Sequence, residues 1–169
     1  ETFVYLSEED LGALVAYLQQ LPPVDRHVPI TRLGYLGRAL LALGKLPLLV
    51  AEKTPPLPLT KTTPPDSTLA YGVYLADIAG CRGCHGKSLS GGGVHGPPGT
   101  PPASNLTPAG IGHWQKADFV RALRQGQRLD GRMLHPSMPW QQTALMTDAE
   151  LQALWRYLRS VPPRESGNR

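Results

Sequence analysis

The only two cysteines of this chain stand in the stretch Cys81-Arg82-Gly83-Cys84-His85. A Cys-x-x-Cys-His run is the attachment signature of c-type haem. On a helical turn, two thiols three residues apart reach the two vinyl groups at one edge of a porphyrin, and the histidine that follows binds the iron. The stretch therefore predicts one covalent haem c, attached through Cys81 and Cys84, with His85 as the proximal iron ligand.

Three other interpretations of the cysteines compete with this one. A thioredoxin-like redox pair needs a βαβ setting, and the sequence around the motif does not suggest one. A zinc site needs two further ligands at metal spacing, yet His95, His113 and His135 are accompanied by no second C-x-x-C or H-x3-H pattern. The last alternative is a pair of structural cysteines that meets the spacing by chance.

The sixth ligand of the iron determines what such a haem does. Met138 lies in the stretch His135-Pro-Ser-Met-Pro-Trp140, where the flanking prolines restrict the backbone and can aim the sulfur across the haem. Met133 and His135 are the alternatives, and Met146, next to a predicted helix N-cap, is more typical of core. A His/Met pair occupies both faces of the iron and leaves no open site for oxygen chemistry. Met138 as ligand therefore indicates an electron carrier.

One stretch of sequence occurs twice. Residues 7–23 align without gaps on residues 147–163, and both copies end in Pro-Pro. Each copy opens with a candidate N-cap followed three residues later by an acid, and each carries apolar residues at helical spacing. We therefore expect an amphipathic helix in both copies. Each copy resembles the closing helix of a domain, so the chain contains two such helices.

The remaining sequence predicts helices and no strands. No stretch alternates convincingly at period two, so we predict an all-α fold. Gly72 is expected to allow a close crossing of the first and last helices of the second half of the chain. Further helices are expected over residues 31–43, 69–78 and 116–125, and the helix of the second copy is expected over residues 150–160. Long loops are expected over residues 86–112 and 130–143.

Composition and charge narrow the classes of function. At 169 residues, 41% hydrophobic and 18% charged, the chain can bury a core. The net charge of +4 divides into +5 over residues 69–169 and −1 over residues 1–68. The basic residues are dispersed, so we expect no nucleic-acid binding and favour an acidic partner or an anionic membrane surface. The longest apolar run, residues 39–51, is too short for a transmembrane helix, and no secretory signal opens the chain.

Residues 69–163 resemble a class I cytochrome c domain, of the kind found, often in tandem, in membrane-bound dehydrogenase and respiratory complexes. The resemblance implies a class I fold around one covalent haem. It also makes Asn105 and Trp114 candidates to hydrogen-bond the haem propionates, with a turn residue and a packed lid as the respective alternatives. The matching stretches, in the family's order, are Tyr71-Gly-Val-Tyr-Leu75, Cys81–His85, Asn105-Leu-Thr-Pro108, Gly110-Ile-Gly-His-Trp114, Ala117–Arg124, Met138-Pro-Trp140, Tyr157-Leu158 and Pro162-Pro163.

The expected domain organisation has three parts. Residues 1–53 form an N-terminal helical arm that resembles the closing helix and linker of a lost or truncated cytochrome domain. Residues 54–68 form a Pro-rich linker, and residues 69–169 form the cytochrome c domain. Because no first C-x-x-C-H precedes the arm, we expect one haem and not two. The arm is expected either to bind a partner or membrane interface or to wrap its own haem domain.

The sequence thus predicts a mono-haem c-type cytochrome that passes single electrons between redox partner proteins and is not itself an enzyme. The resemblance implies a subunit of a membrane-associated respiratory or dehydrogenase complex on the periplasmic face, where haem c is attached. One setting that it implies is the mono-haem subunit of a quinol-oxidising complex such as alternative complex III. The alternative function is a haem enzyme or sensor with an open or displaceable sixth ligand.

Overall fold

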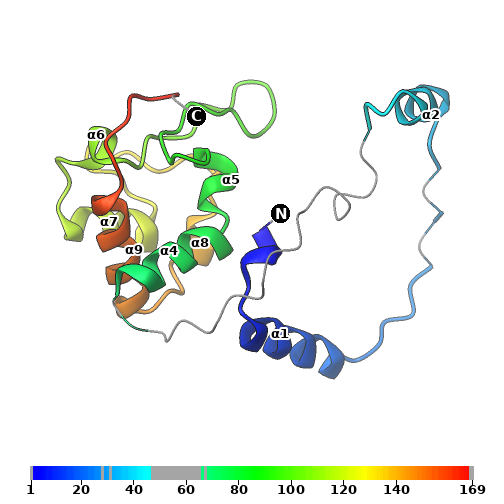
Figure 1. Ribbon diagram of the computed structural model, residues 1–169, viewed down its shortest axis with the longest axis horizontal. Helices are drawn as coiled ribbons and strands as arrows, with labels where there is room; N and C mark the ends of the chain where they lie inside the picture. Colours follow the sequence, from blue (N-terminus) through cyan, green and yellow to red (C-terminus); the bar gives the residue numbers. More distant parts are fainter. Residues whose placement is uncertain (1, 28, 31, 47–65, 67, 168–169) are drawn as a thin grey trace. The chain divides into compact units, whose positions relative to one another are not determined.

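The computed structural model describes residues 2–27, 29–30, 32–46, 66 and 68–167 (Figure 1). Contacts between residues divide the chain into one unit within residues 1–62 and another within residues 63–169, with Thr2 assigned to the second. The predicted Pro-rich linker, residues 54–68, lies outside the described residues except for Asp66 and Thr68. Each unit is therefore described by itself.

The N-terminal part contains a 3-10 helix, η1 (Thr2–Tyr5), and two α-helices, α1 (Glu8–Gln20) and α2 (Tyr35–Ala42). The predicted N-cap of α1 is confirmed, because the backbone N–H of Asp10 donates to Ser7 Oγ over 3.1 Å. Helix α2 is shorter than the predicted helix over residues 31–43, since extended Gly34 is its N-cap. No residue of α1 or α2 is buried.

The second unit holds six helices in the part of the chain that the structure describes, and the all-α prediction is confirmed. Two of them lie inside segments that were predicted to be loops, because a single turn is too short to produce a helical period. The predicted loop over residues 130–143 therefore ends in a short helix, which begins at Trp140. The six helices are α4 (Leu69–Ile78), α5 (Cys81–His85), α6 (Pro108–Ile111), α7 (Lys116–Gln125), α8 (Trp140–Thr143) and α9 (Asp148–Ser160).

Helices α4 and α9 pack against each other across Gly72, as the sequence predicts (Figure 1). A Cβ placed on Gly72 would lie 2.7 Å from the carbonyl carbon of Ala153 and 2.8 Å from Tyr157 Cβ. Both distances are far inside van der Waals contact, so only glycine permits this crossing. The core formed around it consists of Ala76, Leu89, Ile111, Phe119, Leu123, Leu151, Leu154, Tyr157 and Leu158.

Helix α9 begins with the predicted capping box. The backbone N–H of Glu150 donates to Thr147 Oγ1 over 3.3 Å, and Glu150 Oε2 accepts the backbone N–H of Thr147 over 2.6 Å. Helix α7 ends where predicted, at Gly126, whose φ of 69° is in the left-handed region. Over the residues that the structure describes, none of the helices has the length and apolar character needed to cross a membrane.

Candidate functional site

Helix α5 carries both thiols on one turn, directly after α4. Gly80 joins the two helices in the left-handed conformation, with φ of 72°. Both cysteines are free thiols, and Cys81 packs against the core cluster. Burial raises the pKa of the Cys81 thiol to about 11. The first thiol of the motif therefore lies in an apolar setting.

The imidazole of His85 is buried and held by one defined hydrogen bond. The residue is 8% exposed, and Nδ1 lies 2.7 Å from the carbonyl oxygen of Ser104. Because a carbonyl oxygen only accepts, Nδ1 carries the proton and the lone pair remains on Nε2. Burial lowers the pKa of His85, while the bond to Ser104 acts in the opposite direction. This arrangement presents Nε2 as a metal ligand.

The Gly/Pro-rich segment after the motif brings Ser104 back to His85. The N–H of Gly91 donates to the His85 carbonyl over 2.8 Å, and the N–H of Leu106 donates to the Leu89 carbonyl over 2.8 Å. Gly91 has φ of 72°, and a Cβ there would lie 2.6 Å from the carbonyl carbon of Ser104. The glycine thus lets the returning chain pass closely enough to reach the imidazole.

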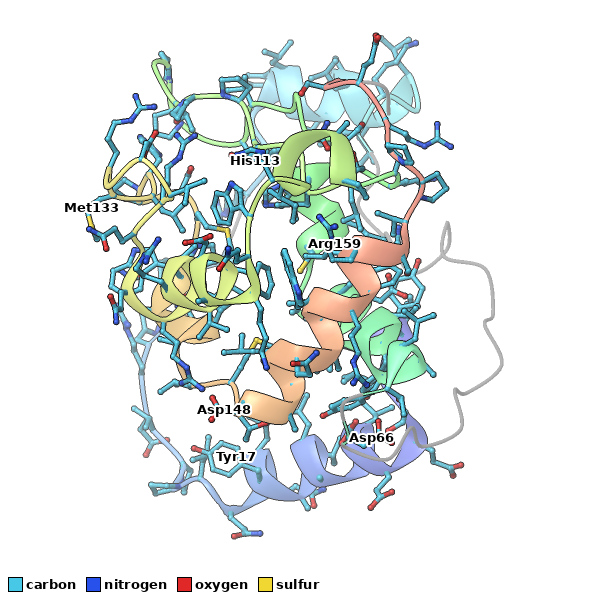
Figure 2. All side chains as sticks on the ribbon, turned by 90° about the vertical axis from the view of Figure 1, so that its left-hand side faces the viewer. Tyr17, Asp66, His113, Met133, Asp148 and Arg159 are labelled. Carbon is cyan, nitrogen blue, oxygen red and sulfur yellow. The ribbon has the colours of Figure 1, made fainter. Side chains whose placement is uncertain are left out.

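Met138, the predicted sixth ligand, is half-buried in the structure. It packs against the core cluster and contacts His85, which is consistent with His/Met ligation of one iron. Met133 is 58% exposed and lies at the periphery of its unit (Figure 2). His135 is exposed too, and its Nδ1 is paired with Ser137. The two alternatives to Met138 therefore lie on the surface.

Asn105 and Trp114, the candidates for propionate contact, have other partners among the described residues. Asn105 Nδ2 donates to the Arg164 carbonyl over 2.7 Å, and its Oδ1 accepts the backbone N–H of Thr107 over 2.9 Å. Trp114 is partly buried against the core cluster. These contacts match the turn residue and the packed lid considered from the sequence. Propionate binding by either side chain stays a prediction.

Arg82, inside the haem-type motif, connects the motif to two other helices. Its Nε donates to Asp77 Oδ1 over 2.5 Å, its guanidinium donates to the Tyr157 hydroxyl, and it lies 5.8 Å from the centre of that ring. Helix α5 is thereby tied to α4 and α9. Nothing local in the sequence reveals the contact, because Tyr157 is 75 residues away.

The donors of the site fit a haem better than a lone metal ion. Two thiols on one turn, an imidazole with a free Nε2 and a thioether sulfur are the groups that a His/Met haem c requires. Across the described ranges, no cluster of three or more His, Cys, Asp or Glu residues could hold a metal ion. The zinc interpretation therefore finds no donor set in those ranges.

Comparisons with known proteins point the same way. A family model described as Cytochrome c matches residues 69–162. The chain is 35% identical over 117 residues to the fructose dehydrogenase cytochrome subunit of Gluconobacter japonicus. It is 39% identical over 115 residues to the cytochrome c subunit of the alcohol dehydrogenase (quinone) of Gluconacetobacter polyoxogenes. It is 36% identical over 138 residues to one of the subunits of the nicotinate dehydrogenase of Pseudomonas putida.

These alignments cover most of this chain but little of the relatives. They span 64%, 62% and 77% of the chain, and 24%, 25% and 12% of the three relatives respectively. The chain thus spans a quarter or less of the length of these curated relatives.

Proposed function

This chain belongs to the cytochrome c family, and on that premise we propose that it is a mono-haem electron carrier within a dehydrogenase complex. The observation that carries the proposal is the contact of Met138 with His85, whose ring is oriented by Ser104. A haem c bound between them would take up and release one electron at a time.

The residues of the site have distinct roles in this proposal. Cys81 and Cys84 would hold the haem through thioether bonds, and His85 Nε2 and Met138 Sδ would be the ligands of its iron. The Ser104 carbonyl fixes the ring orientation of His85 and increases the basicity of Nε2. With both side chains as ligands, the haem would supply one-electron chemistry and would offer no open site to water or oxygen. The chain is therefore a carrier and not an enzyme by itself.

The partners follow from the relatives and from the charge. Three of the similar proteins are named as subunits of fructose, alcohol and nicotinate dehydrogenases, so we place this chain beside a dehydrogenase subunit that supplies its electrons. The charge of +5 over residues 69–169 favours a partner protein whose docking face is acidic. A quinol-oxidising complex such as alternative complex III is the second setting. Haem c attachment places the chain outside the cytoplasm, held at the membrane by its complex.

The test is a set of visible spectra of the oxidised and reduced protein before and after acid-acetone extraction. Haem retained through extraction is expected, because thioether bonds survive it. A weak far-red sulfur-to-iron band is expected to disappear in Met138→Ala. The matched control is Met133→Ala, which removes an exposed methionine and should keep the band.

Two results would contradict the proposal. Haem that is lost on extraction would show that it is not covalently attached through Cys81 and Cys84. Binding of carbon monoxide to the reduced native protein would favour the haem enzyme or sensor, because it requires an open or displaceable sixth site at Met138.

A further inference from the structure

Residues 164–167, which follow α9, are bonded to the chain segment that orients His85. In Figure 1 this part of the chain runs past α6 toward the C-terminus. Asn105 Nδ2 donates to the Arg164 carbonyl over 2.7 Å, and the backbone N–H of Arg164 donates to Thr107 Oγ1 over 3.2 Å. We call residues 164–167 the C-terminal strap, because their two ends are bonded to two different segments.

The far end of the C-terminal strap contacts the segment that leads out of the haem-type motif. The backbone N–H of Gly167 donates to the carbonyl of Ser90, a fully buried residue, over 3.2 Å. A Cβ on Gly92, whose φ is 82°, would lie 2.5 Å from Gly167 Cα. The neighbouring Gly91 donates its N–H to the His85 carbonyl over 2.8 Å. The strap therefore packs closely against the chain that is bonded to the backbone of His85.

The near end of the strap is held by two polar side chains. Asn105 Oδ1 accepts the backbone N–H of Thr107 over 2.9 Å and its hydroxyl over 2.8 Å. Asn105 Nδ2 reaches Ser166 Oγ at 3.5 Å in addition to the Arg164 carbonyl. Thr107 is fully buried and is the N-cap of α6, but its hydroxyl makes no capping bond. Both side chains are thus engaged in joining their own segment to the strap.

This junction lies next to the carbonyl that orients His85. Ser104, the residue before Asn105, accepts the proton of His85 Nδ1 over 2.7 Å. Ser104 acts through its backbone, so the position of its carbonyl is set by the residues on either side. On one side, the N–H of Ala103 donates to the Gly93 carbonyl over 2.7 Å. On the other side, the segment is fixed by the junction with the strap. A displaced Ser104 carbonyl would weaken the bond to Nδ1 and make Nε2 less basic.

We propose that Asn105 and Thr107 are positioning residues for His85. They hold the C-terminal strap, and the junction fixes the Ser104 carbonyl against Nδ1. The strength of that hydrogen bond sets the basicity of Nε2, and through it the reduction potential of the haem. The inference rests on the proposed function, because it takes His85 as an iron ligand. It gives Asn105 a role that requires no contact with a propionate.

The test compares Thr107→Val with Thr107→Ser in the full haem-loaded chain. Valine has the shape of threonine without the hydroxyl, whereas serine keeps the hydroxyl. In Thr107→Val, NMR of the isotope-labelled protein should show the Nδ1 proton of His85 exchanging with heavy water about tenfold faster or more, because the bond to Ser104 opens more often. Thr107→Ser should restore nearly native exchange. Asn105→Ala breaks the same junction from its other side and should act like Thr107→Val.

A redox titration of the same variants gives the second readout. In Thr107→Val, the ratio of reduced to oxidised haem at a fixed solution potential should rise about threefold or more, since a less basic Nε2 stabilises ferric iron less. A domain that merely loosens and admits water would favour the charged ferric haem and lower this ratio. The sign of the change therefore separates positioning of His85 from a general loss of packing.

Tyr71→Phe is the matched control, because it also removes a hydroxyl, one that donates to Glu150 Oε1 over 3.3 Å and lies outside the strap. It should leave the exchange of the Nδ1 proton and the redox ratio unchanged. Circular dichroism of every variant verifies that the helices are intact, so a change in either readout belongs to the junction.

Three results would overturn the proposal. Native exchange of the Nδ1 proton in Thr107→Val would show that the Ser104 carbonyl stays in place without the junction. A lowered redox ratio would show loosening alone. A redox change in Asn105→Ala with none in Thr107→Val would assign Asn105 to a haem propionate. Loss of haem on extraction, or a native protein without the far-red band, would instead contradict the proposed function, and the exchange comparison would still decide the role of Thr107.

Discussion

Arg82 connects the haem-type motif to two other helices of its unit. It joins α5 to Asp77 on α4 and to Tyr157 on α9. We predict that Arg82→Gln lowers the free energy of unfolding by about 1–3 kcal/mol, because a partly buried carboxylate loses a charged hydrogen-bond donor. Guanidinium denaturation of the haem-loaded protein, followed by circular dichroism, measures this loss.

The matched control is Lys87→Gln, which removes the same charge from an exposed side chain five residues away. Its expected effect is close to zero, since surface charges contribute little to stability. Equal losses in both variants would show that Arg82 acts only through net charge and not through Asp77 and Tyr157.

The residues that bind the haem were predictable, but the residues that orient them were not. Cys81, Cys84 and His85 form a local motif, so the sequence identifies them directly. Ser104 is 19 residues from His85 and acts through its backbone carbonyl, which any residue type provides. The contact of Arg82 with Tyr157 likewise depends on how two distant helices meet. Such partners appear only when the fold brings them together.

The crossing of α4 and α9 leaves no room for one added carbon atom at Gly72. We predict that Gly72→Ala destabilises the second unit, although alanine favours a helix over glycine by about 1 kcal/mol. The added Cβ would lie 2.8 Å from Tyr157 Cβ and force the helices apart. A net loss of about 2 kcal/mol or more in chemical denaturation is expected.

The control for this prediction is Gly12→Ala in α1, where, among the described residues, nothing beyond the adjacent residues and the helix's own backbone lies within 4 Å of the added Cβ. Far-ultraviolet circular dichroism should show equal or greater helix content there. If Gly72→Ala were as harmless as Gly12→Ala, the close packing of α4 on α9 would be wrong.

At the level of elements, the length of a helix and its capping residues decide whether the sequence predicts it. Helices α4 and α7 have the predicted bounds. Helix α7 has a clear apolar face and ends at Gly126, whereas α4 is apolar nearly all round and is capped by Thr68. Helices α6 and α8 were missed because four residues make one turn. Their stability comes from packing, which no local pattern in the sequence records.

At the scale of the whole molecule, charge governs the encounter with a partner. Residues 69–169 hold eleven Lys and Arg against six Asp and Glu, a balance that two haem propionates would only partly offset. We predict that ferricyanide, an anion, oxidises the reduced protein more slowly as salt is added, because the screening length falls from about 30 Å at 0.01 M to about 8 Å at 0.15 M. Stopped-flow haem absorbance gives the rate. A cationic cobalt(III) phenanthroline oxidant is the control and should show the opposite trend. Oxidation rates that do not change with salt concentration for either oxidant would mean that the positive charge lies away from the site where the electron leaves the protein.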